Sequence, residues 1–144
     1  MADDLILLVE DDPDHEELAL AALRQHNSYR VASVHDGVEA LEYLDRAAAG
    51  TDGSGFPRVI LLDLKLPRLD GIETLKRIRS NPRTAMIPVV IMTSSRQDED
   101  LLRSYRSGAN SYIRKPIDFS EFRDTMRHFG LYWLRLNEPA PKRG

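Results

Sequence analysis

Five short aliphatic runs alternate with segments of helical pattern, and this alternation constrains the fold more than any other feature of the sequence. The runs are apolar at successive positions, which is typical of parallel strands covered by helices on both faces. The sequence therefore predicts a doubly wound α/β domain, with a five-stranded parallel sheet flanked by five helices. The expected strands are residues 5–9, 29–34, 59–62, 88–92 and 111–113. The expected helices are residues 13–25, 37–49, 72–79, 97–107 and a last one from about 118, and a glycine-rich loop is expected at 50–57.

Length and composition exclude several classes of protein. The chain has 144 residues, the size of one domain, and its aliphatic stretches are far shorter than the ~20 residues that cross a bilayer. It has no cysteine, which excludes disulfide frameworks, thiolate metal sites and a cysteine nucleophile and fits a reducing cytoplasm. The net charge of −3 gives no reason to expect nucleic acid or a membrane as a partner. No signal peptide is recognisable, so a cytoplasmic location is expected.

Polar side chains follow four of the five expected strands. In open parallel sheets, ligands bind outside the carboxyl ends of the strands, so these side chains are expected to converge on one edge. They are Glu10, Asp11 and Asp12 after the first strand, Asp63 after the third, Thr93, Ser94 and Ser95 after the fourth, and Arg114, Lys115 and Pro116 after the fifth.

The residue types at this edge indicate a particular chemistry. Clustered carboxylates repel one another and need protons or a shared cation. The candidate ligands are hard oxygens, so Mg²⁺ is expected rather than Ca²⁺ or Mn²⁺. Thr93 and Lys115 could bind phosphate oxygens beside the metal, and Asp63 would then be a nucleophile that forms an aspartyl phosphate. The alternative is structural, with acidic residues in turns or at helix N-caps, as is expected for Asp12 and Asp70.

Five motifs together resemble the receiver domains of two-component response regulators, the CheY-like superfamily with its flavodoxin-like fold. They are residues 9–12 (VEDD), 62–67 (LDLKLP), 70–71 (DG), 92–94 (MTS) and 115–116 (KP). The resemblance suggests a receiver domain at residues 1–128, followed by a C-terminal extension of the last helix at 129–144. The spacing from Asp11 to Asp63 is longer than in the family, and the loop at 50–57 accounts for the excess.

The resemblance implies that Asp63 is the phosphoacceptor and that Mg²⁺ binds beside it. Asp11 would bind the ion directly, Glu10 mainly through water, and Lys65 through its main-chain carbonyl. The protein would be a signalling protein that catalyses only its own phosphorylation and dephosphorylation. Lys65 and Ser95 occupy the family positions that flank the path of hydrolytic water. Ser95 offers no carboxylate or amide to orient the water, and the Lys65 stem can crowd the site, which predicts slow loss of the phosphoryl group.

Other residues would respond to the phosphoryl group. The resemblance implies that Thr93 and Lys115 contact it and that Ser94 leaves room for it. Tyr112 matches the aromatic switch residue, whose ring turns inward as Thr93 moves toward the phosphate. The Lys115–Pro116 peptide bond is expected to be cis.

Two additional segments, the loop at 50–57 and the tail at 130–134 (GLYWL), resemble the stand-alone receivers that partner bacterial phytochrome-type histidine kinases. A sensor histidine kinase of this type is therefore the expected phosphoryl donor. Only 28 residues follow Pro116, fewer than the ~50 of a small domain. The expected output is therefore a downstream protein, a phosphotransfer partner or a change of oligomeric state.

Aromatic residues gather in the C-terminal quarter of the chain. A heptad-like stripe predicts a helix that continues through Gly130 and leaves apolar side chains exposed beyond the sheet. Its members are Phe119, Phe122, Met126, Phe129, Trp133 and Leu136. We expect a homodimer on this surface, with Tyr112, Phe122, Phe129, Tyr132, Trp133 and Leu134 at the interface. The alternative is that the tail folds back over its own domain.

Three other functions fit the sequence less well. A haloacid dehalogenase-like phosphatase would need a second aspartate at position 65, where this chain has lysine. A flavin-binding electron carrier would need a phosphate-binding loop after the first strand, where the acidic residues 10–12 would repel the phosphate. A pseudo-receiver that serves only as a docking module would not need the complete set of acidic residues. We assign no function to the scattered histidines or to a basic cluster expected on a solvated face. These residues are His15, His26, His35 and His128, and Arg77, Arg79 and Arg83.

Overall fold

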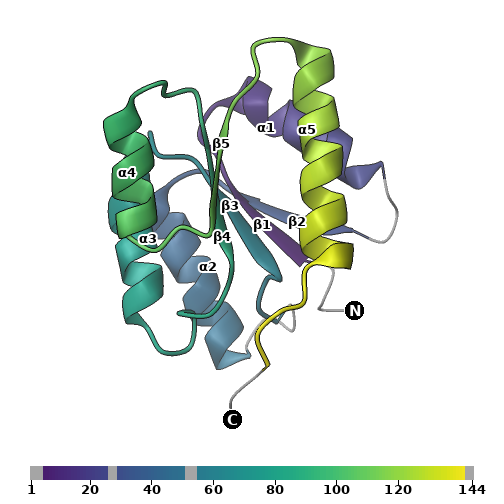
Figure 1. Cartoon of the computed structure of the whole chain (residues 1–144). Helices are drawn as coiled ribbons and strands as arrows, with labels where there is room; N and C mark the ends of the chain where they lie inside the picture. Colours follow the sequence, from purple (N-terminus) through teal and green to yellow (C-terminus); the bar gives the residue numbers. More distant parts are fainter. Residues whose placement is uncertain (1–4, 26–28, 51–54, 142–144) are drawn as a thin grey trace.

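The computed structural model describes residues 5–25, 29–50 and 55–141. Its five strands form one parallel sheet in the order β2-β1-β3-β4-β5, which confirms the predicted doubly wound fold (Figure 1). The strands are β1 (Leu5–Val9), β2 (Arg30–Val34), β3 (Val59–Leu62), β4 (Val89–Thr93) and β5 (Ser111–Arg114). The helices are α1 (Pro13–Arg24), α2 (Gly37–Ala49), α3 (Gly71–Ser80), α4 (Asp98–Arg106) and α5 (Phe119–Leu131), followed by a π-helical turn, η2 (Tyr132–Leu136). Residues 51–54 of the expected loop, and His26, lie outside the described residues.

The two faces of the sheet bury separate apolar clusters. Alternate residues of β1 point in opposite directions, so Leu7 packs in the cluster beneath α2 and α3 whereas Leu8 packs in the cluster beneath α1 and α5. Figure 1 shows the same division, with α1 beside α5 on one side of the sheet and α2 beside α3 on the other. Burial on both faces explains why the strands are continuously apolar.

Four helices begin at an aspartate that caps their first turn. Asp12, Asp36, Asp70 and Asp118 each accept a hydrogen bond from a main-chain N–H in the first turn of α1, α2, α3 and α5. The predicted capping roles of Asp12 and Asp70 are confirmed. In the described part of the chain, no helix has the length and apolar character needed to span a membrane.

The C-terminal segment packs onto the domain more closely than the sequence suggested. Gly130 is buried, and a Cβ atom there would lie 2.7 Å from Cε2 of Tyr29, so only glycine allows this approach. The π-helical turn then changes the helical register and brings Leu134 into the cluster beneath α1 and α5. Arg135 also contacts Tyr29, because the central carbon of its guanidinium lies 4.9 Å from the centroid of the Tyr29 ring.

This packing corrects part of the expected dimer interface. Phe122, Phe129 and Leu134 are all buried in the chain's own core and are not available to a partner, because the tail folds back as the alternative required. Tyr132 remains about half exposed, and Trp133 is partly buried against the core.

The basic cluster also differs from expectation. Arg79 was expected on a solvated face, but its guanidinium donates to the carbonyl oxygens of Ala85, Ile87 and Gly108 and to Oδ1 of Asn110. The four acceptors replace the water that a surface arginine would bind. They lie in the segments before β4 and β5, so Arg79 joins the amino ends of these two strands.

Candidate functional site

Strand pairing brings the acidic residues together at the carboxyl edge of the sheet. Val9 of β1 pairs with Leu62 of β3, so the residues that follow them, Glu10 and Asp63, are neighbours. The main-chain N–H of Asp63 donates to the carbonyl oxygen of Val9 over 3.1 Å, which extends the ladder to the site itself. The sheet therefore fixes the positions of residues that are far apart in the sequence.

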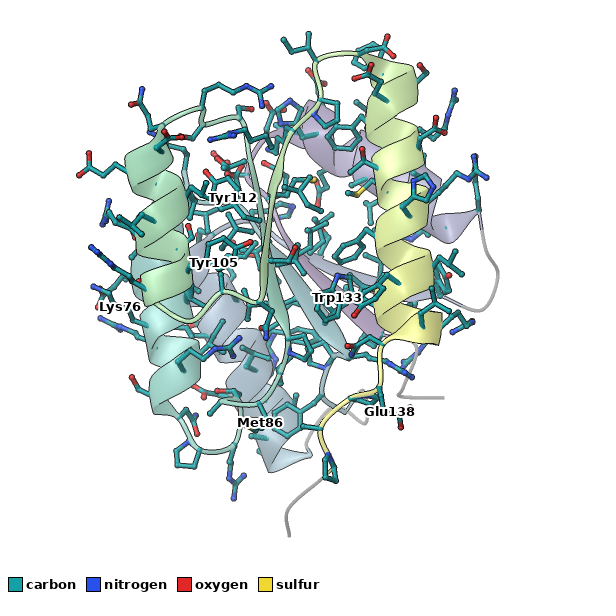
Figure 2. The ribbon with its side chains drawn as sticks, in the orientation of Figure 1. Lys76, Met86, Tyr105, Tyr112, Trp133 and Glu138 are labelled. Atoms are coloured by element: carbon teal, nitrogen blue, oxygen red, sulfur yellow. The ribbon has the colours of Figure 1, made fainter. Side chains whose placement is uncertain are left out.

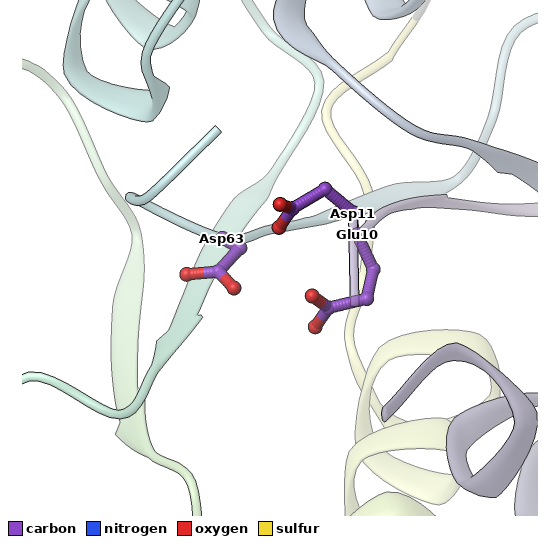
Figure 3. A group of neighbouring side chains, drawn as sticks. All are labelled: Glu10, Asp11 and Asp63. Carbon is purple, nitrogen blue, oxygen red and sulfur yellow. The ribbon is translucent and has the colours of Figure 1, made fainter. Parts of the chain in front are cut away.

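Glu10, Asp11 and Asp63 form a cluster of three carboxylates (Figure 3). One oxygen from each lies within 4.8 Å of the others. Glu10 and Asp63 are buried, whereas Asp11 is exposed, so the cluster opens to solvent on one side. Three carboxylate oxygens at this separation, with an open side for water or phosphate, fit a hard divalent cation such as Mg²⁺.

The loop that follows Asp63 turns back sharply over the strand end. The main-chain N–H of Lys65 donates to Oδ1 of Asp63 over 3.3 Å, so one carboxylate oxygen is already oriented by the loop. Gly71 closes the loop, because a Cβ atom there would lie 2.3 Å from the carbonyl oxygen of Asp63. Arg68, which adopts a left-handed conformation with φ of 64°, makes two hydrogen bonds to the buried carboxylate of Asp36.

Lys115 supplies the positive charge of the site. Its ammonium nitrogen Nζ donates to Oε1 of Glu10 over 2.6 Å and to Oδ2 of Asp63 over 2.9 Å, and the side chain is buried. Burial by itself lowers the pKa of Lys115, but the charge of Asp63 and the bonds to both carboxylates outweigh it and raise the pKa. Burial and the nearby Asp63 raise the pKa of Glu10 to about 7, although Lys115 opposes the shift. In the absence of metal, the site is therefore a buried ionic network in which the Glu10 carboxyl holds its proton more tightly than an exposed glutamate does.

Thr93 and Ser95 lie at the end of β4. Thr93 is fully buried, and its hydroxyl oxygen accepts a hydrogen bond from the main-chain N–H of Ser95 over 3.3 Å. The Ser95 hydroxyl donates to Oδ2 of Asp100 over 2.6 Å. That bond ties Ser95 to the first turn of α4. Ser94 is exposed.

Tyr112 of β5 packs against the cluster beneath α2 and α3, and its hydroxyl oxygen is buried without a hydrogen-bond partner among the described residues (Figure 2). Burial raises the pKa of this hydroxyl. The ring of Tyr112 is therefore partly buried against this cluster, and its role as a switch residue stays a prediction.

The structure contradicts one expectation at this edge and adds one residue to it. Among the described residues there is no cis peptide bond, so the expected cis Lys115–Pro116 bond is wrong. The trans form is the ordinary preference of a bond before proline. His15 of α1 also reaches the site, with Nδ1 2.9 Å from Nζ of Lys115. No local pattern in the sequence predicts this contact, apart from the position of His15 shortly after the acidic residues.

The chain matches the model of the response regulator receiver domain over residues 6–127. It is a member of the receiver domain family. The match covers most of the chain and agrees with the geometry of the strand ends, so the predicted family is confirmed.

Known relatives extend the similarity beyond the fold. The receiver domain is 40% identical over 139 residues to the probable methanogenesis regulatory protein FilR2 of Methanothrix harundinacea, covering 95% of this chain and 88% of that protein. The phosphorylated cyanobacterial phytochrome response regulator RcpA superposes with a TM-score of 0.88 at 34% identity, covering 96% of this chain and 99% of that one. The Mn²⁺-bound form of response regulator Rcp1 superposes with a TM-score of 0.86 at 30% identity, with the same coverage. The receiver domain is thus homologous to phytochrome-associated response regulators, in which phosphorylation and binding of a divalent metal are typical.

Proposed function

We propose that this receiver domain is a single-domain response regulator that takes a phosphoryl group from a histidine kinase onto Asp63. A carboxylate oxygen of Asp63 attacks the phosphorus of the kinase phosphohistidine, and an O–P bond forms. The N–P bond breaks, and its electron pair returns to the imidazole nitrogen of the kinase. The products are an aspartyl phosphate and a free kinase histidine.

The residues around Asp63 have separate roles in this reaction. Lys115 carries a fixed positive charge to within 2.9 Å of the attacking carboxylate, where it can pair with a phosphoryl oxygen. The Thr93 hydroxyl can donate to a second oxygen, and the N–H of Lys65 orients Asp63. The observation that carries the proposal is the buried ammonium of Lys115 between two buried carboxylates. Acidic residues that only capped helices would not need such a cation.

The carboxylate cluster supports Mg²⁺ as the resident cofactor. Asp11, Asp63 and the carbonyl of Lys65 would hold the ion directly and Glu10 through water. When bound, Mg²⁺ would neutralise the carboxylates and the oxygens of the transferring phosphoryl group.

Mass spectrometry of the intact protein tests the assignment. Acetyl phosphate replaces the kinase as donor, and wild-type protein with Mg²⁺ is expected to gain the mass of one phosphoryl group. Asp63→Asn, and wild type with excess chelator, are expected to gain nothing. Asp70→Asn is the matched control, because it changes an aspartate that only caps α3 and replaces it by another good cap. Equal labelling of Asp63→Asn would refute the assignment, and failure of wild type to label would favour a docking module.

The similarity to RcpA and Rcp1 supports a phytochrome-type sensor kinase as the donor. We propose that the two proteins meet in the cytoplasm, where the cysteine-free composition fits. A phosphorylated phytochrome-type kinase is expected to transfer its label to this receiver faster than an unrelated histidine kinase does. Equal rates with both kinases would remove the support for this pathway.

An apolar surface on α4, β5 and the end of α5 supports a homodimer as the output. Leu102, Tyr105, Leu131, Tyr132 and Leu136 each expose about half of their area or more. Between β5 and α5 lies an open groove of about 520 Å³, which Ile113, Tyr132 and Trp133 help to line. Exposed apolar side chains that gather at a groove are a feature of partner sites.

Sedimentation tests the dimer. Wild type is expected to sediment as a dimer at tens of micromolar, and Leu131→Glu as a monomer. Met86→Glu is the control, since Met86 is even more exposed but belongs to the segment between α3 and β4 and not to α4, β5 or α5. A monomeric wild type would refute the dimer and leave a downstream protein or a phosphotransfer partner as the output.

A further inference from the structure

Lys115 has a third partner that the phosphorylation chemistry described above does not use. An ammonium group has three N–H donors, and those of Lys115 meet three acceptors: Oε1 of Glu10 at 2.6 Å, Oδ2 of Asp63 at 2.9 Å and Nδ1 of His15 at 2.9 Å. Because the Lys115 side chain is buried, an N–H that loses its acceptor has few solvent contacts to compensate. His15 therefore completes the hydrogen bonding of the charged group beside Asp63.

The tautomer and position of the His15 ring follow from its neighbours. Since an ammonium cannot accept, Nδ1 must be the accepting nitrogen and the ring proton lies on Nε2. The ring faces Phe122 of α5, with centroids 6.2 Å apart and planes inclined by 31°. Oδ2 of Asp12 lies 3.6 Å from Nδ1, too far for a hydrogen bond, whereas Oδ1 of Asp12 accepts the capping bonds of α1.

We propose that His15 is a positioning residue for Lys115 in the phosphorylation of Asp63; this inference rests on the proposed function. When the phosphoryl group forms on Asp63, one of its oxygens takes the place of the Asp63 carboxylate as an acceptor, so the three N–H donors then meet the phosphoryl oxygen, Glu10 and His15. A bond to neutral His15 holds the ammonium at the strand edge without adding a competing negative charge. Without this acceptor, the ammonium loses one of three anchors and points less often toward the reacting carboxylate.

Two substitutions separate the lone pair of His15 from its bulk. His15→Asn places an amide oxygen near the position of Nδ1 and keeps an acceptor, whereas His15→Leu keeps apolar volume against Phe122 but has none. Neither change removes the cap of α1, because Asp12 bonds to main-chain N–H groups. His35→Leu is the matched control, since His35 contacts Glu16 and Glu39 and not Lys115.

The first measurement is the rate of phosphorylation by acetyl phosphate with Mg²⁺, in which the attack of Asp63 on phosphorus expels acetate. His15→Leu is expected to react about tenfold more slowly than wild type, the effect of one lost hydrogen bond to a buried charge. His15→Asn is expected to recover to within about twofold, and His35→Leu to match wild type. A rate for His15→Leu within about twofold of wild type, or no recovery with His15→Asn, overturns the proposal.

The second measurement needs no metal and no reaction. The ¹H–¹⁵N signal of the Lys115 ammonium is expected to be slow in exchange and visible by NMR in wild type and His15→Asn, and to broaden in His15→Leu. An unchanged signal in His15→Leu overturns the proposal, even if wild type takes no phosphoryl group and the proposed function fails. His15→Ala gives the same comparison if His15→Leu does not fold.

Discussion

Lys115 and Asp63 follow different strands, 52 residues apart in the sequence, yet Nζ of Lys115 lies 2.9 Å from Oδ2 of Asp63 in a buried contact. The same ammonium bonds Glu10, so one cation balances two buried carboxylates. Removing a charge from such a network leaves its partners without compensation, and several of the predictions below depend on this balance.

Lys115→Met is expected to lower the free energy of unfolding by about 3 kcal/mol at neutral pH in metal-free buffer, because Glu10 and Asp63 then face each other without a cation. Added Mg²⁺ is expected to restore part of the loss by replacing the missing charge. Urea denaturation with and without chelator measures both effects. Lys76→Met, at an exposed position on α3, is the control. A stability of Lys115→Met equal to that of Lys76→Met would contradict the prediction.

Glu10 is expected to make the stability of the metal-free protein depend on pH. Burial raises the pKa of its carboxyl from 4.5 to about 7, so the folded chain binds this proton more tightly than the unfolded chain. Its contribution is therefore complete below about pH 4.5 and is lost as the pH rises to about 7. The stability of wild type minus that of Glu10→Gln is expected to fall by about 3 kcal/mol over this range in chelator. Glu17→Gln, at an exposed position of α1, is the control and is expected to show no such trend. If the stability difference between wild type and Glu10→Gln does not change with pH, Glu10 is not the source of the pH dependence.

The aspartyl phosphate is expected to decay slowly. Ser95 has no carboxylate or amide, its hydroxyl already donates to Asp100, and the Lys65 side chain can crowd the path of the attacking water. Lys65→Asn is expected to speed the decay, as followed by loss of the phosphoryl mass after acetyl phosphate is removed. An unchanged lifetime in the double variant Lys65→Asn, Ser95→Glu would refute this explanation.

Gly130→Ala is expected to destabilise the protein by about 2 kcal/mol, although alanine is the better helix former by ~1 kcal/mol. The added methyl group would lie 2.7 Å from the Tyr29 ring, which is buried and cannot move away freely. Thermal denaturation of Gly130→Ala, Tyr29→Leu and the double variant tests the cause. If the loss is the same in the Tyr29→Leu background, the contact is not responsible.

The sequence predicted the sheet well because each strand carries a local signal. Continuous apolar runs and capping aspartates locate β1 to β5 and most helices to within one or two residues. The carboxyl-edge rule then places Glu10, Asp63, Thr93 and Lys115 at one edge without any knowledge of side-chain geometry.

The missed features depend on contacts between distant residues. His15 meets Lys115 across 100 positions, and Arg79 meets Asn110 across 31, so no local pattern reveals either contact. The burial of Leu134 depends on the π-helical turn, whereas the heptad-like stripe assumed a regular helix. The expected cis bond at Pro116 came from family resemblance and not from a feature of the residues.

The bond between Lys115 and Glu10 joins the end of the last strand to the end of the first, across 105 positions. Closing so long a segment is entropically costly, and β5 joins the sheet only through β4 at its edge. Until β5 docks, Glu10 and Asp63 have no ammonium beside them and the acceptor lacks its cationic partner. Competence to receive a phosphoryl group therefore depends on the docking of the edge strand β5, because a chain with β5 detached keeps its acceptor carboxylate but lacks the ammonium that pairs with it.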